Sequence, residues 1–283
     1  MGDWHSKISL FLRLLRIKDW RAYLLIVLLG FIISEGFLFP FREIFFFWLI
    51  IFSFLGFGFS INECYDTKED RLHKEKEKFF IGKKLTFKKG IIISFITALL
   101  GLAFSAYFGF KIFLFALFSL LLGLFYSVPP LRFKERPFLD LISHGLFAGA
   151  LLFLFPLIVF KKEFTSLDYF LTLSIFYLSV ILELRNHLED YPSDKKAKLK
   201  TVACFLGYQK TENFLKYLAF FYPLILLPIF LSISYLLFLY FYFFTLFFFL
   251  AFLLSKDLLL GKNYRIFDIY IVFCFGTVLL VHL

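Results

Sequence analysis

Long apolar stretches recur along the whole chain and set the strongest limit on its fold. Of the 283 residues, 61% are hydrophobic and 48 are phenylalanine, more than the interior of a soluble domain of this length could bury. Stretches of about 17–25 apolar residues are long enough to cross a membrane as helices. Apolar and polar residues do not alternate within them, as they would in the strands of a membrane barrel. We therefore predict an all-α, polytopic membrane protein, with residues 1–283 forming a single domain.

Nine transmembrane helices account for these stretches. The predicted spans are 22–39, 44–61, 90–108, 112–128, 138–160, 167–185, 214–232, 236–254 and 266–282. Between Lys216 and Lys256, 39 residues carry no charged side chain, which is too many for one helical crossing. A tight turn near residues 232–235 would divide this segment into the seventh and eighth spans.

The distribution of basic residues predicts the orientation. With the N-terminus in the cytosol, 27 of the 31 Lys and Arg residues fall on the cytosolic side, which is the side that such residues favour. We therefore expect a cytosolic N-terminus and an external C-terminus. The richness in Phe, Ile and Lys is typical of a prokaryotic chain, so the cell membrane is the expected location. The net charge of +10 is explained by this bias and by contact with anionic lipids, and it requires no nucleic-acid partner.

Two copies of an acidic motif follow the second and sixth spans. Both read Asn-x-x-x-Asp-x-x-x-Asp, with Asn62, Asp66 and Asp70 in the first and Asn186, Asp190 and Asp194 in the second. On a helix, a spacing of four places side chains on one face, roughly 6 Å apart along the axis. Carboxylates this close repel one another. We therefore expect a hard divalent cation, bound by these oxygen atoms and bridged to phosphate.

Basic residues accompany the acidic motifs on the predicted cytosolic side. Lysine-rich segments follow each motif, at 71–84 and 195–200. The loop 126–137, in which a double proline ends the fourth span, carries Arg132, Lys134 and Arg136. These side chains can anchor the loops at the membrane surface, or they can bind phosphate oxygens that a metal leaves uncovered.

Several ionisable residues fall within or at the ends of predicted spans, where charge is costly and usually faces a partner or a cavity. They are Asp140, His144, Glu183, Arg185 and Asp268. Asp140 and His144 are four residues apart, so we expect them to satisfy each other. Gly145 and Gly149 on the same helix form a small-residue face that is typical of close helix contact.

Three motifs in this order resemble those of the UbiA superfamily of intramembrane prenyltransferases. They are the first acidic motif, the sequence Tyr126-Ser127-Val128-Pro129-Pro130-Leu131-Arg132-Phe133-Lys134, and the Asp190–Asp194 motif with its continuation to Thr201 and Leu206-Gly207. The resemblance covers nearly the whole chain. It implies nine helices around a central cavity with a polar cap on the cytosolic side. It also implies a prenyltransferase, which moves an isoprenoid chain from a polyprenyl diphosphate to a hydrophobic or aromatic acceptor.

The same resemblance implies roles for individual residues. Magnesium, the expected cofactor, would be bound by Asn62, Asp66, Asp70, Asp190 and Asp194, and the four aspartates would also be the catalytic groups. The diphosphate would be bound by Arg132 and Lys134 with Tyr126 close by, and the weaker candidates for this task are Lys74, Lys78 and Lys198. Two departures from the family pattern stand out. The Arg-Pro pair that often closes the first motif is replaced by residues 76–80, and Pro192 interrupts the helical spacing of the second motif.

The sequence leaves the acceptor open. Aromatic acceptors of quinone synthesis, glycerol-phosphate ether lipids and a second isoprenoid chain all suit the family. The segment 13–20 is also loosely similar to the branch that joins phosphoribose to a polyprenyl phosphate. A different class of function is an ion-coupled transporter, which intramembrane charges also suit. Transporters place their sites near the midplane, whereas the acids here gather at one surface, so we predict an enzyme.

Overall fold

The computed structural model describes residues 9–66, 85–160, 163–254 and 265–282, and most of them are helical. Among these residues, six helices are long and apolar enough to cross a membrane. They are α3 (Phe41–Tyr65), α5 (Phe87–Tyr107), α6 (Phe110–Ser127), the continuous helix formed by α7 (Leu139–His144), η5 (Gly145–Ala150) and α8 (Leu151–Phe160), α9 (Ser166–Glu189), and α12 (Tyr208–Ile233). They coincide with the second to seventh predicted spans, so the all-α membrane fold is confirmed.

Three shorter apolar helices coincide with the remaining predicted spans. They are α2 (Arg21–Ile33), α13 (Tyr235–Leu254) and α14 (Arg265–His282). Only Ser234 separates the end of α12 from the start of α13, which confirms the turn predicted near 232–235. The apolar stretches of these three helices among the described side chains are Arg21–Ile33, Tyr235–Leu250 and Phe267–Val281. These stretches are short for a full crossing, so the count of nine membrane spans remains a prediction.

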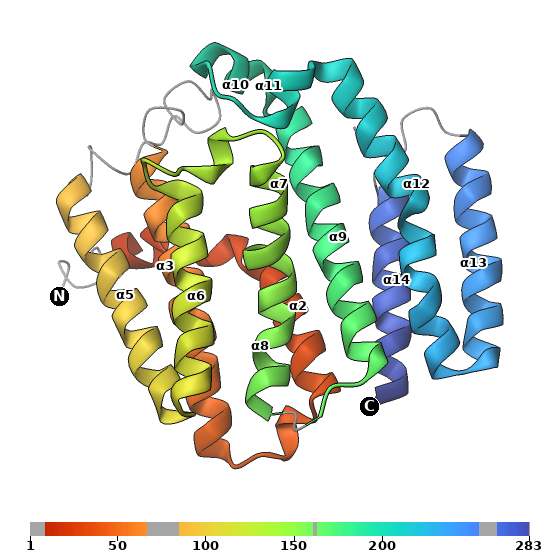
Figure 1. Cartoon of the computed structure of the whole chain (residues 1–283), viewed down its shortest axis with the longest axis horizontal. Helices are drawn as coiled ribbons and strands as arrows, with labels where there is room; N and C mark the ends of the chain where they lie inside the picture. The colour runs from red at the N-terminus through yellow and green to blue at the C-terminus, as the bar shows by residue number, and fades with distance from the viewer. Residues whose placement is uncertain (1–8, 67–84, 161–162, 255–264, 283) are drawn as a thin grey trace.

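The helices stand side by side in one bundle (Figure 1). Helix α3 packs against α5 and α6, α2 packs against α8, and α9 packs against α12 and η5. Helices α13 and α14 lie with α12 on the C-terminal side of the bundle. Two large clusters of buried apolar side chains run through it, one centred on α2, α3 and α8 and the other on α9, α12 and the C-terminal helices.

A π-helix, η5, brings its helix unusually close to α9. A Cβ atom placed on Gly149 would lie 2.9 Å from the Cβ of Ser179, and one placed on Gly145 would lie 2.7 Å from the ring of Phe176. Glycine permits this approach because it has no side chain. The predicted small-residue contact is therefore confirmed, and its partner is α9.

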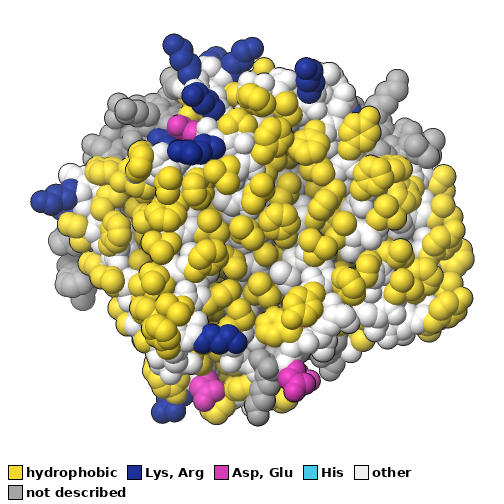
Figure 2. Space-filling view, in the orientation of Figure 1, with side chains coloured by type: hydrophobic (Ala, Val, Ile, Leu, Met, Phe, Trp, Pro, Cys, Tyr) yellow, Lys and Arg dark blue, Asp and Glu magenta, His cyan; other side chains and the backbone are white. Residues whose placement is uncertain are grey.

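Hydrophobic side chains cover most of the face seen in Figure 2, and Lys and Arg gather mainly at one end of it. The end of α3, the connection from α6 to α7, and the short helices α10 (Tyr191–Ala197) and α11 (Val202–Leu206) all lie at that end (Figure 1). An apolar belt with charge at the ends suits a lipid environment. The three polar segments that the sequence assigns to the cytosol thus share one end of the bundle, and the side of the membrane that this end faces remains a prediction.

Candidate active site

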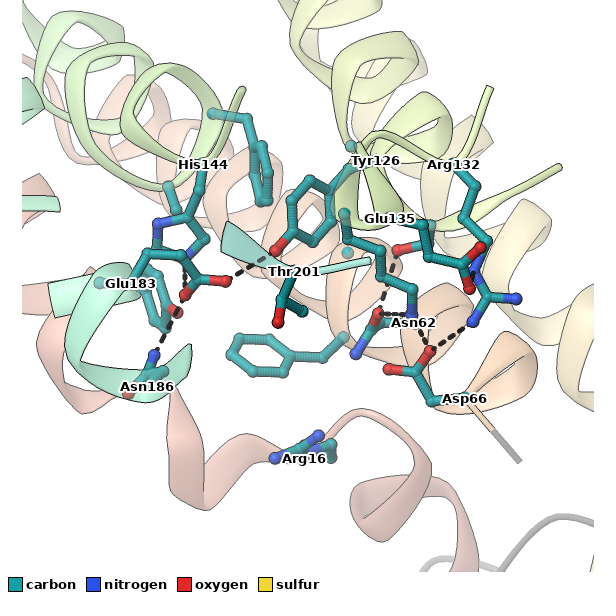
Figure 3. Close-up of a pocket in the computed structure, with 18 of the residues that line it drawn as sticks. Arg16, Asn62, Asp66, Tyr126, Arg132, Glu135, His144, Glu183, Asn186 and Thr201 are labelled. Atoms are coloured by element: carbon teal, nitrogen blue, oxygen red, sulfur yellow. Dashed lines mark hydrogen bonds and ion pairs between the residues drawn. The ribbon is translucent and has the colours of Figure 1, made fainter. Parts of the chain in front are cut away.

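A cavity of about 330 Å³ opens among α2, α3, α6, α7 and α9 at the polar end of the bundle. Its wall is polar where the two acidic motifs and the 126–137 loop meet, and apolar deeper in the bundle. The apolar wall consists of Phe54, Leu55, Phe57, Phe59, Phe147, Ala148 and Leu152. Figure 3 shows the polar part, with side chains from separate helices pointing toward one another. The cavity therefore joins a charged mouth to an aromatic interior.

The first acidic motif lies at the C-terminal end of α3. Asn62 is in the last turn, and Asp66 caps the helix with its backbone N–H bonded to the Asn62 carbonyl at 2.9 Å. The Asn62 side-chain oxygen accepts hydrogen bonds from the Ser127 hydroxyl and the Lys134 ammonium, both at 3.1 Å. Helix α3 thus presents Asn62 and Asp66 to the cavity. Asp70, Lys74 and Lys78 lie outside the described residues.

The loop after α6 brings two of the predicted cations onto this motif. Lys134, in the 3₁₀ turn η4 (Phe133–Glu135), forms an ion pair with Asp66. Arg132 precedes the turn with a left-handed backbone (φ 35°) and places its Nη2 atom 3.7 Å from the same carboxylate oxygen. Its Nε atom pairs with Glu135 at 2.9 Å. Burial lowers the pKa of Lys134 to about 7, while nearby Glu135 acts in the opposite direction.

The second acidic motif bends instead of lying on one helical face. Asp190 caps the end of α9 and also begins α10, and Pro192 lies in the first turn of α10. Asp194 is buried within α10 and accepts a hydrogen bond from the Thr201 hydroxyl at 3.4 Å. Asp190, Asp194 and Thr201 all line the cavity. The interruption expected from Pro192 is therefore present, yet the motif still faces the first one across the cavity.

Glu183 is the centre of a polar cluster that the sequence did not reveal. Its carboxylate accepts hydrogen bonds from the Tyr126 hydroxyl at 2.8 Å and from the Asn186 amide at 3.1 Å. The Nε2 atoms of His144 and His187 lie 3.4 and 3.5 Å from it. Tyr126, predicted to lie close to the diphosphate, does line the cavity. Its hydroxyl, however, is bonded to this carboxylate on α9.

The predicted pairing of Asp140 with His144 is wrong. Asp140 instead lies 3.5 Å from the Nε2 atom of His187, and His144 faces Glu183 and, at 3.0 Å, the hydroxyl of Ser179. Helix α9 packs so closely on η5 that its side chains satisfy both residues. The sequence signal for this was present in part, because Glu183 and His187 are also four residues apart on an apolar helix.

Two further basic residues, Arg16 and Lys198, differ in their position relative to the cavity. Arg16, which entered the sequence predictions only as part of the segment 13–20, lines the cavity with its guanidinium 5.5 Å above the ring of Phe59. It pairs with Asp19 at 2.7 Å and lies 3.8 Å from Glu63. Lys198 is exposed at the end of α10 and is not among the residues that line the cavity.

The sequence model of the UbiA prenyltransferase family matches residues 23–275. The chain belongs to this family. As a UbiA-family chain it is an enzyme of the prenyltransferase class, and membership decides against the ion-coupled transporter. The match covers every element that lines the cavity except the segment that carries Arg16.

Individual UbiA relatives agree with this assignment. The chain is 25% identical over 208 residues to digeranylgeranylglyceryl phosphate synthase of Saccharolobus solfataricus, covering 74% of this chain and 72% of the relative. It is 23% identical over 175 residues to the protein of the same name from Pyrococcus horikoshii, covering 61% and 60%. A solved structure of a UbiA homologue from Archaeoglobus fulgidus, bound to GPP and Mg²⁺, superposes with a TM-score of 0.69 at 25% identity, covering 95% of this chain and 99% of that one.

The donor atoms of the UbiA-family cavity suit a hard divalent cation. Asn62, Asp66, Asp190 and Asp194 offer carboxylate and amide oxygens, which are the ligands that magnesium prefers. Within the described ranges, no three Asp, Glu, His or Cys side chains gather closely enough to hold a metal ion by themselves. Magnesium commonly keeps several ligands from water and substrate phosphate, so two separated pairs of protein oxygens fit a metal that is shared with a diphosphate.

Proposed function

We propose that this chain is a magnesium-dependent prenyltransferase that moves an isoprenoid chain from its diphosphate to a glycerol-phosphate ether lipid. The observation that carries the proposal is the meeting of the two acidic motifs with Lys134 and Arg132 around one cavity. The carboxylates of the two motifs would repel one another unless a metal bound between them. Lys134 and Arg132 supply positive charge for a polyanion at the same place.

Asn62, Asp66, Asp190 and Asp194 are the residues that would hold the metal, joined by Asp70 from the sequence pattern. Magnesium bound there would offset the negative charge that grows on the diphosphate as the allylic C–O bond breaks. Lys134 and Arg132 bind the remaining phosphate oxygens, because both already lie against Asp66 at the mouth of the cavity. Lys74 and Lys78 stay candidates from the sequence for the same task.

The aromatic wall of the cavity receives the isoprenoid chain. Phe54, Phe57, Phe59 and Phe147 surround the space beyond the charged mouth. Their faces carry negative electrostatic potential, which stabilises a developing allyl cation, and their bulk excludes water that would otherwise react with it. The chain's own role in this step is thus to bind, to orient the reactive carbon and to keep the site dry.

The lipid acceptor is supported by two lines of argument. Two relatives carry the name digeranylgeranylglyceryl phosphate synthase, and Arg16 supplies a cation at the cavity wall in addition to the Lys134 and Arg132 pair. An acceptor with its own phosphate group requires such a cation. A neutral isoprenoid acceptor offers no anion to this cation.

The test uses purified protein in nanodiscs with radiolabelled geranylgeranyl and farnesyl diphosphates. The acceptors are geranylgeranylglyceryl phosphate, 4-hydroxybenzoate, a dihydroxynaphthoate and a carotenoid, each with magnesium and with excess chelator. We expect a labelled product with the glyceryl phosphate only, and no product in chelator. A product with an aromatic acceptor alone would overturn the choice of acceptor, and an unchanged rate in chelator would overturn the role of the metal.

A further inference from the structure

The Glu183 cluster has no task in the binding of the metal or of the diphosphate. Among the described residues, the carboxylates that line the cavity are Asp66, Glu135, Glu183, Asp190 and Asp194. Three of them belong to the acidic motifs, and Glu135 is paired with Arg132. Glu183 remains, 8% exposed, and a buried carboxylate is costly unless it is fully bonded or used in chemistry.

The proposed reaction releases one proton that no residue described so far accepts. The inference about this proton rests on the proposed function. A hydroxyl acceptor that forms an ether loses its proton as it attacks. The cavity beyond the mouth is lined largely by aromatic side chains, which disfavour free water. A protein group within hydrogen-bond reach of the acceptor can take the proton there.

Tyr126 lines the cavity beside both the first acidic motif and Glu183. Its hydroxyl is bonded to Glu183, whereas the next residue, Ser127, is bonded to Asn62 of the first acidic motif. The phenol thus lies between the metal-binding end of the cavity and the carboxylate on α9, as the close-up shows (Figure 3). Its ring also packs against Phe147 of the apolar wall, with centroids 4.8 Å apart.

We propose that Tyr126 and Glu183 together accept the proton of the acceptor hydroxyl. The acceptor oxygen bonds to the first carbon of the isoprenoid, and the bond from that carbon to the diphosphate breaks, its electron pair leaving with the diphosphate. The acceptor proton moves to the phenolic oxygen of Tyr126 while the phenolic proton moves to Glu183. The proton leaves Glu183 for water once the products have departed.

The neighbours of Glu183 hold its carboxylate in place beside Tyr126. Asn186, His144 and His187 surround the carboxylate on the sides that Tyr126 leaves free. The two imidazoles are in turn held by Ser179 and by Asp140. These are positioning residues, since each acts through Glu183 and not on the substrate.

The experiment compares two acceptors in wild type, Glu183→Gln and Tyr126→Phe. One acceptor is geranylgeranylglyceryl phosphate, and the other is its analogue with a thiol in place of the reacting hydroxyl. A thiol gives up its proton far more readily than an alcohol does, as the cysteine pKa near 8.5 shows, so at pH 9 its attack depends much less on a proton acceptor. Glu189→Gln and Tyr177→Phe are matched controls, because both residues are on α9 and neither lines the cavity.

We expect kcat with the hydroxyl acceptor to fall by about 100-fold or more in both variants, the range typical of general-base catalysis. With the thiol analogue the loss should stay below about 10-fold, and the Kd of a geranylgeranyl thiodiphosphate should be unchanged. Equal losses with both acceptors, or a hydroxyl-acceptor rate in Tyr126→Phe and Glu183→Gln equal to that of the wild type, would overturn the assignment. If Glu183→Gln does not fold, Tyr126→Phe decides alone. A wild-type protein that makes no product with either acceptor contradicts the proposed function itself.

Discussion

Tyr126 and Ser127 are adjacent at the end of α6 and donate hydrogen bonds in two directions. The Tyr126 hydroxyl reaches Glu183 on α9 at 2.8 Å, and the Ser127 hydroxyl reaches Asn62 on α3 at 3.1 Å. One turn of α6 therefore fixes the relative positions of the first acidic motif and the buried carboxylate. Both bonds join residues more than fifty positions apart, so they also hold three helices at the mouth of the cavity.

Removal of one motif carboxylate should stop turnover without unfolding the protein. We expect Asp190→Asn to lower kcat/KM by at least about 100-fold, because the charge that stabilises the transition state is lost. The measurement is product formation at saturating magnesium, with thermal unfolding in detergent as a check on folding. Glu189→Gln, which changes the neighbouring acid outside the cavity, should keep the wild-type rate. Equal rates in Asp190→Asn and Glu189→Gln would contradict the metal-binding role.

Lys134 and Lys198 were both predicted to bind the diphosphate, but of the two only Lys134 lines the cavity. Lys134→Ala should weaken binding of geranylgeranyl thiodiphosphate by about 10- to 100-fold, the value of a hydrogen bond to a charged group. Lys198→Asn should leave the Kd within about twofold, because Lys198 is exposed beyond the cavity and asparagine tolerates its left-handed backbone. Titration calorimetry measures the Kd in both variants. A larger effect at Lys198 would show that α10 moves over the site.

Substitution of Arg16 should weaken binding of the acceptor and leave binding of the donor unchanged. We expect Arg16→Gln to raise the KM for geranylgeranylglyceryl phosphate by about 10-fold through the loss of one charge-assisted hydrogen bond. The KM for an acceptor that lacks the phosphate should not change, and neither should the Kd of the donor. Lys18→Gln, an exposed cation two residues away, serves as the control. A raised Kd for the donor would place Arg16 in the diphosphate site instead.

Gly149 should not tolerate even one added methyl group. In Gly149→Ala, the new Cβ would meet Ser179 Cβ at 2.9 Å and the Ile175 carbonyl at 3.1 Å, and we expect a loss of about 1–3 kcal/mol in the free energy of unfolding. Gly276→Ala, where the added atom meets nothing within 4 Å, should be neutral or stabilising, since alanine favours helices. Thermal unfolding in one detergent compares the two. A smaller effect at Gly149 would mean that α9 can move away at low cost.

The orientation can be tested directly. A reporter that is active only outside the cytosol should be active when fused after Leu283, because the basic residues predict a cytosolic N-terminus and nine crossings. A reporter fused before the chain should give the opposite result. If the C-terminal fusion reports the cytosol, one crossing has been miscounted, and the segment 217–255 is the place to look.

Much of the fold follows from local sequence. The length of each apolar stretch gave the helices, and the uncharged run before Lys256 gave the turn at Ser234. The acidic motifs and the Tyr126–Lys134 loop were identified because each is continuous in sequence. Their meeting around one cavity could be expected only from the resemblance to a known family.

The polar cluster on α9 could not be found in this way. Asp140 and His144 looked like a pair because they share a helical face, but the helix beside them supplied better partners in His187 and Glu183. That choice depends on how closely α9 approaches, and Gly145 and Gly149 set this distance. How the helices pack therefore decides which side chains pair between them. Residue spacing within one helix does not predict this.

The π-helix Gly145–Ala150 also determines how the two parts of its helix are oriented relative to each other. A π-turn holds one residue more than the α-turn it replaces. In an ordinary α-helix, one added residue would rotate the segment before it by about 100° relative to the segment after it, whereas a π-turn takes up the added residue within a single turn. His144 in α7 therefore faces Glu183 while Phe153 and Leu157 in α8 lie in the core. The wide turn thus lets one helix carry an additional residue between the cavity and the bundle that supports it without changing the direction in which either part faces.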